Sequence, residues 1–151
     1  MAFRSAQSAN IYPASSLTVT APSGITDGDI LVACVVAWAD YGNPRPYDVG
    51  LPSGFTAWYN PAVDTQYKLC LAWKRASSES GNYTFTATGA AAMFAHVSVF
   101  SGRVASGDPL DVGSNTGYTT SDTIVRAAGV TIATSGSDLI YCGFIEVEAP
   151  T

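Results

Sequence analysis

The longest uncharged apolar run in the chain lies between Ile30 and Trp38 and follows the turn-forming residues Asp27–Asp29. Val32, Val35 and Val36 are β-branched, which favours a pleated strand over a helix. A short unbroken apolar run bounded by turn residues is typical of a central strand that is buried on both faces. A buried helix is the alternative, because periodicity alone does not separate the two structures in a run of this length.

Alternation of apolar and polar residues predicts strands over most of the remaining chain. Leu17 and Val19 alternate with threonines, and Tyr83 and Phe85 do the same. Such alternation is typical of strands with one buried face. Besides the central run, we predict strands over Phe3–Ile11, Ser16–Thr20, Gly54–Tyr59, Thr65–Lys74, Asn82–Thr88, Ala92–Phe100, Thr123–Thr134 (as one or two strands) and Leu139–Val147.

About nine strands at short spacing, with no convincing helix, predict an all-β sandwich or barrel. A weak internal repeat refines this prediction. The strand, turn and strand of Leu17–Val36 are similar to those of Val130–Ile145, as in a jelly roll built of two Greek keys. We therefore predict one jelly-roll-like antiparallel β-sandwich domain over residues 1–151, with a short second half. Its predicted core contains Val32, Val36, Leu69, Leu71, Phe85, Val97 and Val99.

Composition excludes several classes of protein. Charged residues make up 13% of the 151 residues, and the net charge is −5, with only seven Lys and Arg. Nucleic-acid binders usually carry a basic face, so we expect no nucleic-acid partner. No apolar run approaches the roughly 20 residues of a membrane-spanning helix. The N-terminus shows no apolar signal-peptide core, so we expect synthesis in the cytoplasm without export through a signal peptide.

The three cysteines, Cys34, Cys70 and Cys142, each lie in an apolar run. Their wide spacing and odd number form neither a disulfide framework nor a zinc motif. Buried free thiols are the expected state, with a Cys34–Cys70 or Cys70–Cys142 bridge as the alternative.

Residues with catalytic chemistry are few. The one histidine, His96, falls in a predicted strand with Phe94, Ser98 and Phe100 on its face, and we expect a packing role. The acidic pairs Asp27/Asp29 and Asp108/Asp111 could join a calcium site, but carboxylates beside Gly or Pro more often cap turns. No nucleotide-binding, hydrolase or metalloprotease motif is present. We predict no catalytic residues, no metal site and no cofactor.

Aromatic residues suggest a binding surface instead. The irregular stretch Ala39–Ser53 is long for a compact domain, and long loops of this kind are often functional. The candidate binding residues, in this loop and the strand after it, are Tyr41, Arg45, Tyr47, Trp58 and Tyr59. Such rings suit a stacking sugar or a protein interface. The alternative is an ordered surface loop, with Trp38 and Trp58 capping the core.

Several motifs along the chain resemble a family of phage and prophage virion proteins, with similar modules in bacterial surface proteins. They are Leu17–Ala33, Pro52–Thr56, Leu71–Ser77, Asn82–Phe85, Val99–Gly102 and Asp108–Asp111. The resemblance covers nearly the whole chain and is specific for fold more than for function. It implies a jelly-roll-like sandwich on a virion surface. Relatives complete the second half with a further Pro-x-Gly-aromatic-Thr strand and more strands, which this chain lacks.

These observations lead to two main functional expectations and a weaker third. The first is a non-enzymatic virion component, above all a capsid decoration protein, with other virion proteins and itself as partners. The second is a carbohydrate-binding tail or fibre module that recognises a surface glycan, and a hydrolase ranks last. Unpaired strand edges pair with other chains, so the expected interface is on the last strand, at Leu139, Tyr141, Ile145 and Val147.

Overall fold

The computed structural model of the chain describes residues 2–39, 48–60, 67–88, 92–102 and 106–109. The chain divides into two compact units, residues 1–105 and residues 106–151. The predicted strands Thr123–Thr134 and Leu139–Val147 lie outside the described residues.

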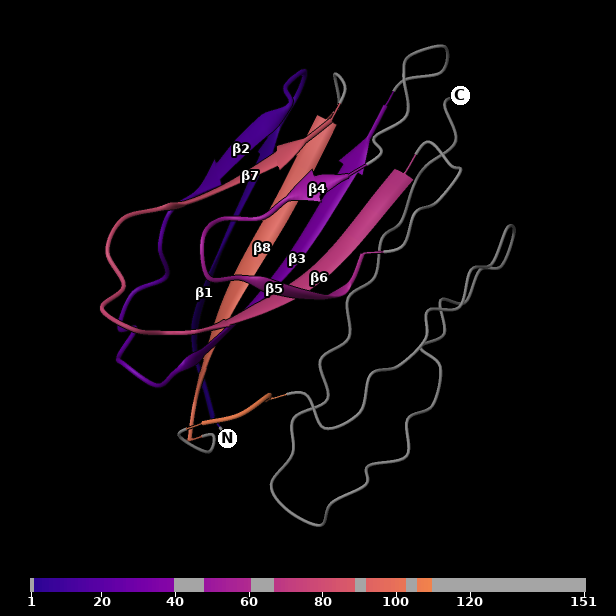
Figure 1. The fold of residues 1–151 in the computed structure, drawn as a ribbon. Helices are drawn as coiled ribbons and strands as arrows, with labels where there is room; N and C mark the ends of the chain where they lie inside the picture. The colour runs from indigo at the N-terminus through magenta and orange to yellow at the C-terminus, as the bar shows by residue number, and fades with distance from the viewer. Residues whose placement is uncertain (1, 40–47, 61–66, 89–91, 103–105, 110–151) are drawn as a thin grey trace, which may run out of the picture. The chain divides into compact units, whose positions relative to one another are not determined.

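Eight strands make up the first unit, and no helix occurs among the described residues (Figure 1). They are β1 (Ala2–Ile11), β2 (Ser16–Val19), β3 (Ile30–Trp38), β4 (Val49–Gly50), β5 (Thr56–Tyr59), β6 (Tyr67–Arg75), β7 (Tyr83–Ala87) and β8 (Ala92–Ser101). The all-β class is thereby confirmed. The two-residue strand β4 was not predicted, because it lies within the stretch interpreted as one long loop.

The strands form two antiparallel sheets, and both belong to one sandwich. One sheet has the order β1-β8-β3-β6-β5, and the other has the order β2-β7-β4. This is the strand arrangement of a jelly roll, with β1, β8, β3 and β6 in one sheet and β2, β7 and β4 in the other. Figure 1 shows β2, β7 and β4 lying across the larger sheet. All eight described strands come from residues 2–101, and Val130–Ile145, the second half of the predicted repeat, lies outside the described residues.

Strand β3 is the central strand that the apolar run predicted, with the same bounds. It pairs with β6 along one side and with β8 along the other, in both cases from Ile30 to Trp38. Every residue from Ile30 to Ala37 is buried. Its two neighbours satisfy its backbone hydrogen-bonding groups, and its side chains contribute to both faces of the sheet.

A tight turn fixes the start of β3. The Asp29 carboxylate accepts hydrogen bonds from the backbone N–H of Thr26 at 2.9 Å and from its hydroxyl at 3.0 Å. It also forms an ion pair with Arg4 of β1 at 2.9 Å. Gly28 has a φ of +89°, which favours glycine, and its N–H donates to the Ala76 carbonyl. Asp29 therefore caps this turn, as the sequence predicted.

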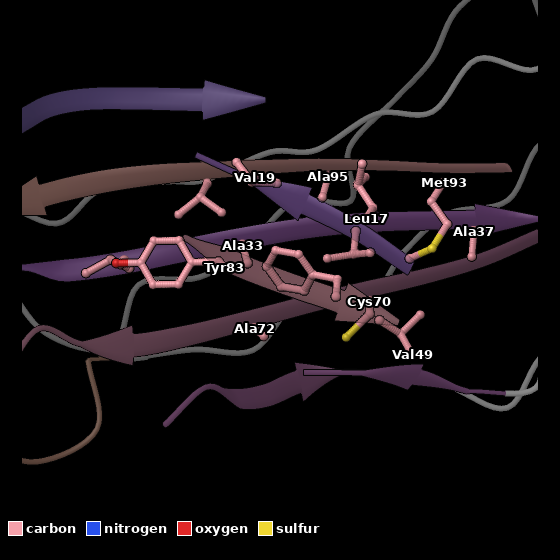
Figure 2. Close-up of a cluster of buried hydrophobic side chains, with 14 of the residues drawn as sticks. Leu17, Val19, Ala33, Ala37, Val49, Cys70, Ala72, Tyr83, Met93 and Ala95 are labelled. Carbon is pink, nitrogen blue, oxygen red and sulfur yellow. The ribbon is translucent and has the colours of Figure 1, made fainter. Parts of the chain in front are cut away.

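The core lies between the sheets, on the inner face of the five-stranded sheet (Figure 2). The three-stranded sheet contributes its larger members, including the rings of Tyr83 and Phe85. The five-stranded sheet presents mainly small or slender residues to them: Leu31, Ala33, Val35, Ala37, Cys70, Ala72, Met93, Ala95, Val97 and Val99. Large side chains on one layer thus face small ones on the other, which suits the close packing of a protein interior.

The predicted core was partly wrong in strand β6. Leu69 and Leu71 are only partly buried and lie on the outer face, whereas Cys70 and Ala72 face the core. Val32 and Val36 are buried, but they alternate with the core residues of β3 and so lie on the outer face as well. Phe85, Val97 and Val99 are core residues as predicted.

We predict unequal costs for truncating Phe85 and Leu71. Phe85→Ala leaves a large cavity between the sheets and should lower the free energy of unfolding by about 3–5 kcal/mol. Leu71→Ala removes a partly exposed side chain and should cost about half as much or less. Denaturant unfolding of both variants measures the difference, and equal losses would show that the two faces are misassigned.

Candidate functional site

The outer face of the five-stranded sheet is largely apolar, and its residues from β3, together with Ser98 and Phe100, are buried. We define it by the residues that alternate with the core positions: Phe3, Ile30, Val32, Cys34, Val36, Leu69, Leu71, Trp73, Phe94, His96, Ser98 and Phe100. Phe3 and Phe100 pack edge to face, with ring centroids 5.9 Å apart. Phe3 is 61% exposed and Phe94 is 38% exposed. Exposed aromatic rings on an apolar sheet face suit contact with another macromolecule.

His96, Cys34 and Ser98 meet on this face, and their arrangement does not favour nucleophilic catalysis. His96 is the register partner of Cys34 in β3 and of Ser8 in β1, and its Nε2 lies 2.8 Å from the Ser98 hydroxyl oxygen. Burial raises the pKa of the Cys34 thiol to about 11, so it stays protonated at neutral pH. No carboxylate is among these register partners to orient the imidazole.

The predicted binding residues are only partly described. Tyr41, Arg45 and Tyr47 lie outside the described residues. Trp58 and Tyr59 lie at the end of β5, where a register shift between Ala57 and Tyr59 pairs Tyr59 with Leu71 and leaves Trp58 as the extra residue of the shift. A bulge of this kind redirects side chains at a sheet edge.

A polar group joins the end of β5 to the end of the long loop. The Asn60 side-chain N–H₂ donates to the Asp48 carboxylate at 3.2 Å, and the same carboxylate accepts from the Val49 N–H at 2.9 Å. Lys68 is only 2% exposed, and its Nζ lies 3.5 Å from the Asn60 carbonyl oxygen. Trp58 and Tyr59 therefore directly precede Asn60, whose side chain is hydrogen-bonded to Asp48 of the candidate loop.

The acidic pair Asp27/Asp29 takes structural roles. Asp29 is occupied by Thr26 and Arg4, and Asp27 accepts a hydrogen bond from the Ser78 N–H at 2.6 Å. Asp111 lies outside the described residues. Among the residues with described positions, no group of three or more His, Cys, Asp or Glu side chains could hold a metal ion.

Sequence reasoning missed a second polar network, which links β6 to β7. Glu79 is 8% exposed and accepts hydrogen bonds from Lys74 Nζ and the Tyr83 hydroxyl at 3.0 Å. Burial raises the pKa of Glu79, but the hydrogen bonds from Lys74, Ser77 and Tyr83 outweigh it and hold that pKa below 4.5. Burial and the bond to Glu79 raise the pKa of Tyr83. These bonds link Glu79, in the β6–β7 connection, to Lys74 of β6 and to the core residue Tyr83 of β7.

Cys34 and Cys70 are buried free thiols, as predicted, so the Cys34–Cys70 bridge does not form. Burial also raises the pKa of Cys70 to about 11. Cys142 and the predicted interface residues Leu139, Tyr141, Ile145 and Val147 lie outside the described residues. The described part of the chain contains no helix with the length and apolarity to span a membrane.

We predict that both described thiols react slowly in the folded protein. Native alkylation at pH 8, followed by mass spectrometry of the peptides, should leave Cys34 and Cys70 unmodified for far longer than in the denatured chain. Rapid native modification of either residue would contradict their burial and their raised pKa values.

We predict that Glu79 contributes to the acid sensitivity of folding. Its folded pKa lies below the unfolded value of 4.5, so its stabilisation is complete above that pH and is lost as the pH falls through the folded pKa. Glu79→Gln should cost about 1–3 kcal/mol at neutral pH and should flatten the decline in stability below pH 4.5.

The matched control is Ser80→Ala, which changes an exposed neighbour without touching the network. Unfolding free energies measured from neutral to acid pH give the comparison. An acid decline in Glu79→Gln as steep as that of the unaltered protein would show that another group causes it.

Comparison of the chain with protein-family models, with curated proteins and with solved structures finds no match in any of the three.

Proposed function

We propose that the protein is a non-enzymatic structural component of a phage virion, most specifically a capsid decoration protein. The observation that carries the proposal is the exposure of two aromatic rings, Phe3 and Phe94, on the outer face of the five-stranded sheet, whose β3 residues are buried. A surface of this kind serves association with other proteins more readily than catalysis on a small molecule.

Three further observations support the proposal. The jelly-roll arrangement is common among viral capsid proteins, although it also occurs in lectins and enzymes. The only histidine, His96, lies beside protonated thiol and hydroxyl groups rather than a carboxylate. The motifs from Leu17 to Asp111 resemble those of phage and prophage virion proteins.

The proposal predicts that the chain is present in purified phage particles at many copies. Mass spectrometry should detect it there, and a particle reconstruction should place it on the outer surface of the capsid. Absence from particles, or presence only among cytoplasmic proteins of the infected cell, would contradict the proposal.

A matched pair of variants tests the role of the outer face. Phe94→Asp introduces a charge on this face and should abolish incorporation into particles, because the charge loses its hydration on contact. Ser16→Asp places the same charge at an exposed position of the three-stranded sheet and should leave incorporation unchanged. The unfolding midpoint of Phe94→Asp must stay near that of the unaltered protein for the comparison to apply, and equal incorporation of both folded variants would refute the assigned face.

A second candidate function is a carbohydrate-binding tail or fibre module. The specific observation is the bulge that places Trp58 and Tyr59 together at the end of β5, near the Asp48–Asn60 anchor of the candidate loop. Binding on a glycan array that Trp58→Ala abolishes and Phe94→Asp retains would favour this function. Particle incorporation without glycan binding would favour the first.

A further inference from the structure

The exposed large apolar side chains of the described residues gather at one edge of the five-stranded sheet. They are Phe3 (61% exposed), Ile11 (38%), Tyr12 (65%) and Phe94 (38%). Phe3 and Ile11 belong to β1, Tyr12 follows β1 directly, and Phe94 lies on β8 opposite Asn10 of β1. Strand β1 is the edge strand of this sheet, so the apolar exposure coincides with a sheet edge.

This edge differs from the other three edges of the sandwich. Strand β1 has ten residues, whereas β5 and β2 have four each and β4 has two. Short strands and bulges protect an edge from pairing with other chains, and β5 has both. Among the described strands, β8 is the one that pairs with β1.

The sequence of β1 does little to block a further strand. It contains no proline, and its single charged residue is Arg4, which is held by Asp29 at 2.9 Å. The register shift of β1 lies between Phe3 and Ser5, so the segment from Ser5 to Ile11 continues without interruption. Its side chains at Ser5, Ala6, Ser8 and Ala9 are small, so a second backbone can approach closely.

We propose that β1 pairs antiparallel with β1 of a second copy of this chain, so that two five-stranded sheets join into one. Every described strand pair is already antiparallel, and a two-fold axis across the edge would continue that pattern. The edge main chain supplies hydrogen bonds on both copies, and the exposed apolar residues supply the contact around them.

The positions of Phe3 and Phe94 select a register for this pairing. Both lie on the outer face, and Phe94 is the β8 partner of Asn10. Pairing centred on Gln7 places Ser5 opposite Ala9, and the bulge at Arg4 then brings Phe3 opposite Asn10 of the other copy. Phe3 of each copy thereby lies on the same face as Phe94 of the other, two strands away across Asn10, so the exposed outer-face rings of the two copies come together around the joined edge in a symmetrical arrangement.

Cysteine cross-linking tests this register directly. Gln7→Cys faces its own symmetry mate across the two-fold axis, so mild oxidation should give a covalent dimer rapidly. Thr56→Cys, at an exposed position on the opposite edge strand β5, is the matched control and should stay monomeric under the same oxidation. Oxidation of the unaltered protein under the same conditions shows whether any dimer forms through its own cysteines.

Charge repulsion supplies a second, independent measurement. Gln7→Lys places two like charges together at the centre of the pairing and should raise the dimer dissociation constant roughly tenfold or more. Thr56→Lys should leave it unchanged. Sedimentation analysis gives the dissociation constants, and thermal unfolding at low concentration checks that both variants are folded.

The outcomes decide the proposal. A dimer that cross-links through Gln7→Cys and dissociates in Gln7→Lys supports it, with hydrogen-exchange protection of β1 increasing on association. A protein that stays monomeric at high concentration overturns it. A dimer that neither cross-links at this position nor weakens in Gln7→Lys also overturns it, because its interface then lies elsewhere.

Discussion

The sandwich depends on the pairing of β3 with two neighbours along its whole length. From Ile30 to Trp38 each residue has a register partner in β6 on one side and in β8 on the other. The three strands together provide most of the inner face that covers the rings of Tyr83 and Phe85. Because buried side chains of β3 also occupy the outer face, the same strand contributes to the core and to the face that carries Phe3 and Phe94. A polar substitution anywhere between Ile30 and Ala37 would therefore disturb one of the two.

The sequence predicted well the elements whose signal is local. The uncharged run of β3 marks a strand buried on both faces, because each neighbour supplies hydrogen bonds and neither face tolerates charge. Alternation of apolar and polar residues identified β2 and β7. The acidic residues beside Gly28 predicted the turn that Asp29 caps. Strand β4 has two residues, too few for any periodicity, so its existence depends on pairing with Ala87 and Thr86 of β7. The all-β class was thus predictable from local patterns.

The face of β6 depends on distant parts of the chain, and the Glu79 network depends on the conformation of the short β6–β7 connection, so the sequence pattern predicted neither. Both faces of β6 carry apolar side chains, and the larger leucines suggested the wrong one. The core side is set instead by the rings of β7, which leave room only for small residues such as Cys70 and Ala72. Glu79 resembles an ordinary surface carboxylate until the β6–β7 connection brings Lys74 and Tyr83 to it. For the candidate site, the sequence singled out Trp58 and Tyr59, but the register shift that pairs Tyr59 with Leu71 follows from sheet pairing.

The adjacency of β1 and β8 has a consequence for how such a unit can be built into longer polypeptides. Ala2 is the register partner of Ser101, so the chain enters and leaves the sandwich at neighbouring points, roughly 5 Å apart between Cα atoms. A unit with adjacent ends can be inserted into a loop of another protein, or repeated along a chain, without separating the segments that flank it. Modular reuse of this sandwich would therefore require only short connecting peptides, with its fold left intact.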